Sequence, residues 1–151
     1  MRIGHAGFAL VAKAFRPRVP LLVLVIAAYG PDIIEIGLWP FHIHNTEYSH
    51  SIISVAFFAT VCAGIWFWIS RSTGSSVTIW LIYASHWCAD FFTGHKPTWP
   101  GGPTVGLDLY RFPVGEMVAE LVVVLVCWLV YRGRSSLAGG PSIAHREAPV
   151  S

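Results

Sequence analysis

The stretch Tyr83-Ala-Ser-His86-Trp-Cys-Ala-Asp90-Phe-Phe-Thr-Gly-His95 decides how this chain folds and where its chemistry lies. It ends an apolar run that begins near Ser76 and is long enough to cross a bilayer, or nearly so. His86 and Asp90 are four residues apart, so on a helix their side chains share one face. Ionisable groups at membrane depth are costly, and they usually mark a site whose other members lie elsewhere in the chain. Such a pair can hold a divalent cation, or it can simply fasten two helices by a hydrogen bond.

The composition is that of an integral membrane protein with a single domain. Of the 151 residues, 54% are hydrophobic and 12% are charged, whereas a soluble domain usually has about 25% charged residues. The net charge of +2 is small, and the basic residues lie in loops and tails, so we expect no nucleic-acid partner. The cysteines show no C-x-x-C spacing and are expected to be small buried residues: Cys62, Cys88 and Cys127.

Four apolar segments predict an all-α integral membrane protein with four transmembrane helices. The predicted spans are residues 21–39, 52–69, 77–94 and 114–131. Pro31 should kink the first span. The loop 95–113 is rich in glycine and proline and should be ordered but irregular. The polar tail is predicted to be disordered, so the helical membrane domain covers residues 1–131 and the tail covers residues 132–151.

The basic residues predict the orientation of the chain in the membrane. If the four spans are correct, one side of the membrane carries six of them: Lys13, Arg16, Arg18, Arg71, Arg132 and Arg134. The opposite side carries only Lys96 and Arg111. We therefore expect the first side, with the C-terminal tail, to be cytoplasmic.

The N-terminal segment has two interpretations. Residues 2–16 look helical and mostly apolar, but Lys13 and Arg16 interrupt any full span. A cleaved signal peptide would explain the basic start and the apolar run 21–28, although that run continues further. The alternative is an N-terminal helix that folds back against the first span about the turn 16–20. At about 1.5 Å per residue, His5 and Asp32 then reach the same height, about 20 Å above that turn.

Every predicted helix places a histidine or a carboxylate in the outer half of the membrane, and the cytoplasmic halves hold almost none. Scattered structural hydrogen bonds have no reason to choose one leaflet, so we predict a shared polar cavity. Its candidate metal ligands are His5, Asp32, His50, His86 and Asp90. Glu120 or Asp32 could act as a general base. Weaker candidates for the cavity are Glu35, Glu47, Glu116 and His95, and we expect His42 and His44 to be solvated.

Imidazoles with one or two carboxylates suit Zn²⁺, or Mn²⁺ and Fe²⁺ if more oxygen ligands take part. A metal with an open coordination position lowers the pKa of its water to about 7 and so supports hydrolysis. The sequence contains no Gly-x-Ser-x-Gly elbow, P-loop, HExxH or Rossmann fingerprint. Serine hydrolysis, nucleotide chemistry and hydride transfer therefore have no positive support.

Short motifs in a fixed order also resemble those of a known family. They are Ile3-Gly-His5, Pro31-Asp32, Tyr48-Ser-His50-Ser51, Ser85-His86-Trp87 with Asp90, His95-Lys-Pro97, Pro100-Gly-Gly-Pro103 and Gly106-Leu before Glu120. In these motifs the chain resembles the YdjM-like small bacterial inner-membrane proteins, which are described as membrane-bound metal-dependent hydrolases. The resemblance covers nearly the whole chain except the tail. It implies a multi-pass protein of the bacterial inner (cytoplasmic) membrane, with His5, Asp32, His50, His86 and Asp90 as metal ligands.

The chain departs from the family pattern in the outer loop. Thr98 stands where an acidic residue often follows the His-x-Pro motif, and Asp108 and Tyr110 stand where glycine and tryptophan are usual. These differences concern the loop over the site rather than the implied ligands.

Three functions agree with these features. The first is a membrane-embedded hydrolase with a divalent metal, preferably zinc, acting on a lipid or a lipid-linked ester or phosphoester. The second is a transporter that relays protons or cations through the same residues, although the polar residues do not continue into the cytoplasmic half. The third is a non-catalytic membrane subunit whose His/Asp pairs fasten helices. We prefer the first, with membrane lipids as partners and the substrate open.

Overall fold

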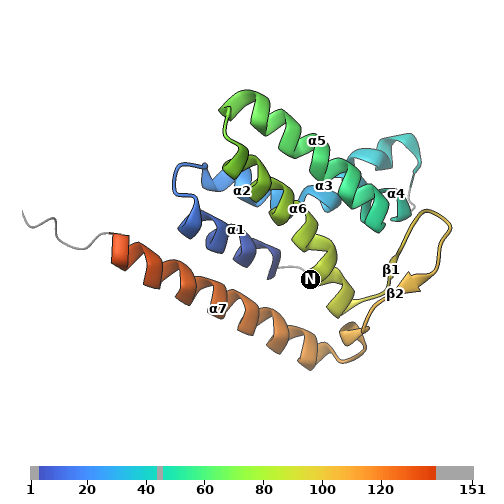
Figure 1. Ribbon diagram of the computed structural model, residues 1–151. Helices are drawn as coiled ribbons and strands as arrows, with labels where there is room; N and C mark the ends of the chain where they lie inside the picture. Colours follow the sequence, from blue (N-terminus) through green and yellow to red (C-terminus); the bar gives the residue numbers. More distant parts are fainter. Residues whose placement is uncertain (1–3, 44–45, 139–151) are drawn as a thin grey trace, which may run out of the picture.

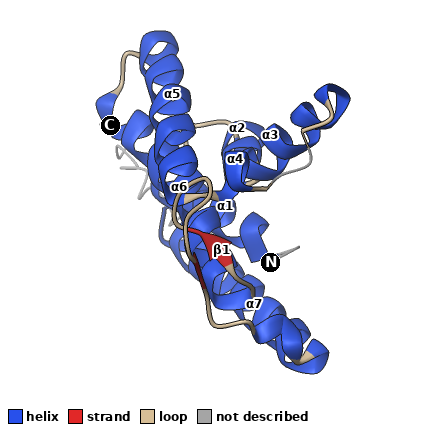
Figure 2. Cartoon of the chain, turned by 90° about the vertical axis from the view of Figure 1, so that its right-hand side faces the viewer, coloured by secondary structure: helices blue, strands red, loops and turns tan. Residues whose placement is uncertain are grey.

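The structure, a computed structural model, describes residues 4–43 and 46–138. As predicted, this part of the chain is mostly helical, and its only strands are two short ones (Figure 2). The helices are α1 (Gly4–Phe15), α2 (Leu21–Ala28), α3 (Gly30–Leu38), η1 (Trp39–Phe41), α4 (Glu47–His50), α5 (Ile52–Ser70), α6 (Thr73–Thr93), η2 (Leu109–Arg111) and α7 (Pro113–Ala138). The strands β1 (Lys96–Pro97) and β2 (Thr104–Val105) pair antiparallel, with Lys96 opposite Val105.

Two helices are long and apolar enough to cross a membrane, namely α5 and the segment Val114–Ser136 of α7. Helices α2 and α3 could form a third span together, but they are bent by 62°. The described residues therefore contain two or three candidate spans, and the four predicted spans are not confirmed. The predicted third span is a helix, α6, but serine, threonine, histidine and aspartate residues lower its hydropathy.

The first predicted span is two helices rather than one kinked helix. Helix α2 ends at Ala28, and α3 begins at Gly30 with Pro31 in its first turn. Proline has no backbone N–H and cannot continue the hydrogen-bond ladder of α2, so the helix breaks here. Because α2 ends at Ala28, the carbonyl of this residue can accept a hydrogen bond from His86 Nδ1, which lies 2.9 Å away.

Helix α1 lies between α7 on one side and α2 and α6 on the other (Figure 1). It folds back against α2, as predicted, and small residues allow the close approach: Ala9 and Ala12 are buried against Leu24 and Ala28. Gly7 lies against α7, where an added Cβ would be 3.1 Å from Cys127 Sγ. This packing carries His5 to the interior.

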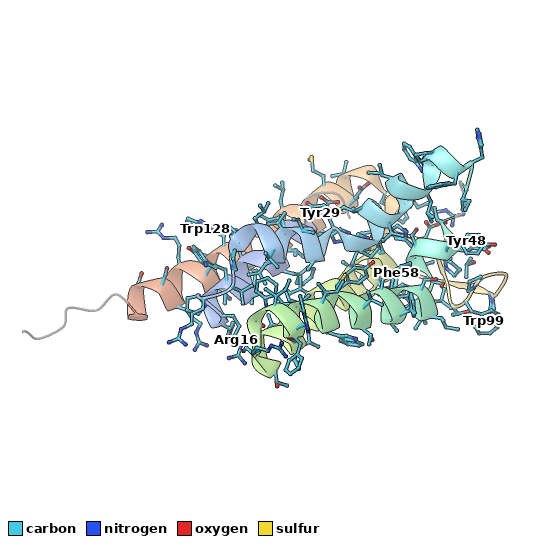
Figure 3. All side chains as sticks on the ribbon, turned by 90° about the horizontal axis from the view of Figure 1, so that it is seen from above. Arg16, Tyr29, Tyr48, Phe58, Trp99 and Trp128 are labelled. Atoms are coloured by element: carbon cyan, nitrogen blue, oxygen red, sulfur yellow. The ribbon has the colours of Figure 1, made fainter. Side chains whose placement is uncertain are left out.

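The two ends of the molecule differ in their side chains (Figure 3). Arg16 and Trp128 lie toward one end, and Tyr48 and Trp99 lie toward the other. The α1–α2 turn, the α5–α6 turn and the C-terminal end of α7 are all at the first end (Figure 1). The predicted grouping of basic residues agrees with this arrangement, while the side that faces the cytoplasm stays a prediction.

Two boundaries differ from the prediction. The loop 95–113 contains the β1–β2 hairpin and η2 rather than only irregular chain. Helix α7 continues past Tyr131 to Ala138, so the disordered tail cannot begin at residue 132 as predicted. The rest of the predicted tail, residues 139–151, and His44 lie outside the described residues.

Gly30 sets the distance between α3 and α6. A Cβ at this position would lie 2.0 Å from Cε2 of Tyr83, a ring that is only 1% exposed. Only the absence of a side chain lets the start of α3 rest on this ring. Asp32 thereby comes within reach of His86, one helical turn beyond Tyr83.

Gly30→Ala is expected to destabilise the protein by about 1–3 kcal/mol, because the added methyl group would force α3 away from Tyr83. The matched control is Gly37→Ala in the same helix, where an added Cβ meets nothing within 4 Å. That control should be neutral or stabilising by up to about 1 kcal/mol. Thermal unfolding in detergent measures both, and equal behaviour of the two variants would contradict this role of Gly30.

Candidate metal centre

The five predicted ligands meet in one place, which we call the His/Asp cluster (His5, Asp32, His50, His86 and Asp90). They come from four helices: His5 from α1, Asp32 from α3, His50 from α4, and His86 and Asp90 from α6. The three imidazoles are at most 2% exposed and Asp90 is 4% exposed. Asp32 differs, because 43% of its side chain is exposed. The cluster is therefore buried on all sides except that of Asp32.

Four ligand atoms of the cluster form a compact group. The Nε2 atoms of His50 and His86 lie 3.3 Å apart. Asp32 Oδ1 lies 3.2 Å from His50 Nε2 and 3.6 Å from His86 Nε2. Asp90 Oδ2 lies 3.3 Å from His86 Nε2 and 3.7 Å from His50 Nε2.

The distances around the two imidazole nitrogens suit a divalent metal ion. With metal–ligand bonds of about 2.0–2.1 Å, neighbouring ligand atoms of a four-coordinate ion are about 3.3 Å apart. Each of the two Nε2 atoms lies 3.2–3.7 Å from the other, from Asp32 Oδ1 and from Asp90 Oδ2. The donor set of two imidazoles and two carboxylates is one that zinc and similar ions accept. The buried His/Asp groups could thus hold a metal ion.

The outer nitrogens of His50 and His86 fix which tautomer faces the cluster. His86 Nδ1 lies 2.9 Å from the Ala28 carbonyl, which can only accept, so Nδ1 carries the proton. His50 Nδ1 lies 3.3 Å from Glu35 Oε2 and 2.7 Å from Ser49 Oγ. The Ser49 hydroxyl can itself donate to the Thr46 carbonyl, 3.2 Å away. Neutral His86 therefore presents its Nε2 lone pair to the cluster, and neutral His50 does the same in the tautomer that donates from Nδ1 to Glu35 or Ser49, as metal-binding histidines do.

A positive charge at the centre would stabilise the tautomers in which both Nε2 atoms carry lone pairs. In those tautomers the two lone pairs, 3.3 Å apart, and the two carboxylates repel one another, and Lys96 offsets this repulsion at Asp90. A divalent cation would convert this repulsion into attraction. Protonation of the imidazoles is the alternative, and it would give ion pairs with Asp32 and Asp90 without any metal.

His5 lies beside the four-atom group. Its ring packs on that of His86, with centroids 3.8 Å apart, and Tyr29 meets it edge-on at 5.7 Å. Its Nε2 lies 3.4 Å from Asp90 Oδ1, but neither ring nitrogen has a hydrogen-bond partner among the described residues. A buried polar atom rarely stays unpaired. His5 also groups with Asp32 and His86 as a set that could hold a metal ion, which would satisfy one of its ring nitrogens.

Sequence reasoning missed Lys96, the nearest cation to the cluster. Its Nζ lies 2.8 Å from Asp90 Oδ2. Lys96 is on β1, and only the turn of the chain after α6 brings it back, so no helical spacing could reveal it. The sequence indicated Glu35 only as a weaker candidate, but it lies one helical turn after Asp32 and its Oε2 is 3.3 Å from His50 Nδ1.

Other predicted residues lie outside the cluster. Glu120 is buried on α7 and interacts electrostatically with Tyr29, but it belongs to none of the candidate ligand groups found in the described chain. Its role as a general base stays a prediction. Glu47 instead accepts from the Gly101 N–H at 2.8 Å and so ties α4 to the β1–β2 loop. His95 is half-exposed and lies 3.6 Å from Asp108.

Comparison with known proteins adds no relative to this description. None of the family models, curated proteins or solved structures compared with the chain matches it. We therefore base the metal centre on the side-chain geometry alone. The identity of the ion stays a prediction.

Purified wild-type protein is expected to contain about one divalent metal ion per chain, because His50, His86 and Asp90 form a buried group of three ligands. His86→Ala should reduce this metal to background. The control His42→Asn removes an exposed imidazole, and asparagine suits the φ of 59° there. Elemental analysis measures the metal, and a full equivalent retained by His86→Ala would contradict the site.

Lys96→Met is expected to lower the free energy of unfolding by about 1–3 kcal/mol, because Asp90 would stay buried without its shortest ion pair. Lys96→Arg keeps the charge and should lose less. Arg111→Gln, at an exposed residue of the same end, is the control. Chemical unfolding in detergent would count against this role if Lys96→Met matched the wild type.

Proposed function

We propose that this protein is a membrane-embedded metal-dependent hydrolase that acts on a lipid or a lipid-linked ester or phosphoester. The observation that carries the proposal is a pair of buried Nε2 atoms, those of His50 and His86, each of which lies 3.2–3.7 Å from the other and from one oxygen of Asp32 and of Asp90. When bound, a divalent cation polarises a carbonyl or phosphoryl oxygen and acidifies water. We expect zinc, because zinc is commonly bound by a small number of histidine nitrogens and carboxylate oxygens.

The proposed roles of the chain's own residues follow from burial. His50, His86 and Asp90 are fully buried and would hold the ion, with Ala28 and Glu35 keeping the imidazoles oriented. Asp32 stands on the open side of the cluster, where water and substrate can reach it. It is therefore our candidate for the group that accepts a proton from water.

Lys96 is proposed to stabilise the negative charge that develops during hydrolysis. Its ammonium group lies at the edge of the cluster and is 20% exposed. A cation in this position can attract an anionic substrate and can stabilise negative charge that develops on its oxygens. The ion pair with Asp90 holds the ammonium group there.

A lipid substrate is supported by an apolar groove next to the cluster. The groove has a volume of about 250 Å³ and runs beside the α2–α3 bend, between α3, α5 and α6. Gly30 and Tyr83, which position Asp32 and His86, also line it, together with Ile26, Ile33 and Ile65. Such a surface accommodates an acyl chain while the ester or phosphoester group reaches the metal centre.

We also propose the four-span arrangement and membership of the YdjM-like group. Helix α6 packs against α1, α2 and α5, so its polar residues need not face lipid. It could therefore cross the bilayer despite its low hydropathy, in addition to α5, α7 and the bent α2–α3 pair. The resemblance to the YdjM-like group implies the bacterial inner membrane, and the basic residues at one end of the molecule favour a cytoplasmic C-terminus.

The wild-type protein is expected to hydrolyse a set of short-chain lipid esters and phosphoesters in detergent, and removal of metal by a chelator should abolish turnover. Asp32→Asn should lower kcat by about 10²–10⁴-fold, the usual contribution of a general base, while most of the metal remains bound. His42→Asn should keep full activity.

Two outcomes would overturn this proposal in different ways. Metal bound at the cluster without turnover of any substrate would leave a metalloprotein that is not a hydrolase. A metal-free protein that His86→Ala and Asp90→Ala merely destabilise would instead indicate a non-catalytic subunit, whose His/Asp pairs fasten helices.

A further inference from the structure

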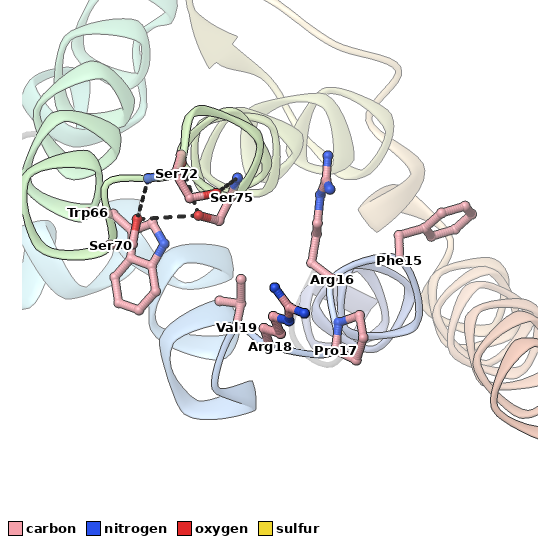
Figure 4. A pocket seen from close by; sticks show the side chains of 9 residues that line it. All are labelled: Phe15, Arg16, Pro17, Arg18, Val19, Trp66, Ser70, Ser72 and Ser75. Atoms are coloured by element: carbon pink, nitrogen blue, oxygen red, sulfur yellow. Dashed lines mark hydrogen bonds between the residues drawn. The ribbon is translucent and has the colours of Figure 1, made fainter. Parts of the chain in front are cut away.

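A second polar cavity lies at the opposite end of the molecule from the His/Asp cluster. It has a volume of about 450 Å³ and opens between the α1–α2 turn and the α5–α6 turn (Figure 4). The α1–α2 turn contributes Arg16 and Arg18, and the other turn contributes three serines. We call it the arginine–serine cavity, defined by Arg16, Arg18, Trp66, Ser70, Ser72 and Ser75.

The charge of this cavity is positive. Two arginines line it, and no carboxylate does so among the described residues. Arg16 also lies over the first turn of α6, since a Cβ at Gly74 would be 2.9 Å from its guanidinium nitrogen. The N-terminus of this 21-residue helix adds the positive end of its dipole.

The cavity also offers hydrogen-bond donors other than the arginines. The three serine hydroxyls lie on one wall (Figure 4), where Ser70 Oγ is 3.3 Å from Ser75 Oγ and the Ser75 hydroxyl also donates to the Ser72 carbonyl at 3.0 Å. The indole Nε1 of Trp66 is buried and has no hydrogen-bond partner within the described ranges. Hydroxyls, an indole N–H and two guanidinium groups are the donors that recognise the oxygens of a phosphate group.

The cavity lies at the end of a candidate membrane span. Ser70 is the last residue of α5, which is one of the candidate spans. If α5 crosses the bilayer, the cavity lies at the level of the lipid headgroups. Anionic headgroups and basic side chains meet at this level of a membrane.

We infer that the arginine–serine cavity binds a phosphate group, either the headgroup of an anionic phospholipid or a soluble phosphate compound. Two guanidinium groups and the start of α6 supply the charge, and the serines and Trp66 supply further donors. This inference is independent of the proposed hydrolase activity, because no member of the cavity belongs to the His/Asp cluster.

Isothermal titration calorimetry in an uncharged maltoside detergent tests the inference with three probes. Dihexanoyl phosphatidic acid offers chains and a phosphate, inorganic phosphate offers the phosphate alone, and dihexanoylglycerol offers the chains alone. We expect saturable binding of phosphatidic acid and none of dihexanoylglycerol. Inorganic phosphate that binds with similar affinity would assign the cavity to soluble compounds, and much weaker binding would assign it to lipid headgroups.

Arg18→Gln is expected to weaken the binding of phosphatidic acid by about tenfold or more, the usual effect of losing one charge-assisted hydrogen bond. Arg16→Gln combined with Arg18→Gln should abolish it. Arg132→Gln is the matched control, because this exposed arginine lies at the same end and stacks on Trp128 instead. His86→Ala should bind phosphatidic acid normally if it folds, which separates this test from that of the metal centre.

Binding of neither phosphate probe to the wild type would overturn the inference. So would a double arginine variant that binds phosphatidic acid as tightly as the wild type. Circular dichroism of each variant establishes that a lost signal does not come from unfolding.

Discussion

The structure depends on an electrostatic constraint, the repulsion among electron-rich atoms held together away from water. Two imidazole nitrogens face each other at 3.3 Å, and each lies 3.2–3.7 Å from an oxygen of Asp32 and of Asp90. The Ala28 carbonyl, the Glu35 carboxylate and the Lys96 ammonium group keep these atoms in place from outside. Buried ionisable groups are costly unless they are paired, and each carboxylate of the cluster pairs with an imidazole or with Lys96.

The irregular parts of the fold position the residues of the His/Asp cluster. The break between α2 and α3 exposes a carbonyl for His86, and the glycine after the break lets Asp32 approach. The short α4 presents His50 and Ser49 together. The β1–β2 hairpin returns a lysine to the cluster, and Glu47 ties the hairpin loop to α4. Regular helices α5 and α7 contribute no candidate ligand in the described chain and instead supply the apolar bulk.

Much of the fold could be predicted because helices obey simple periodicity. The spacing of His86 and Asp90 and the equal heights of His5 and Asp32 follow from the rise of a helix. The break at Tyr29 was harder to predict, since a proline within an apolar run can either kink a helix or end it. The contact between Lys96 and Asp90 could not be predicted, because the position of Lys96 depends on the path of the loop after α6 and not on helical periodicity. The count of four spans is not confirmed for a related reason, since the low hydropathy of α6 comes from polar residues that neighbouring helices can cover.

The order of the ligands along the chain has a consequence for biosynthesis. Ala28 and His86 are 58 residues apart, and His50 and His86 are 36 residues apart. Asp32 is synthesised 18 residues before His50, and His86 follows 36 residues after His50. Until these partners are made, the carboxyl groups are protonated or in contact with water. The cluster can therefore close only after α6 has been synthesised.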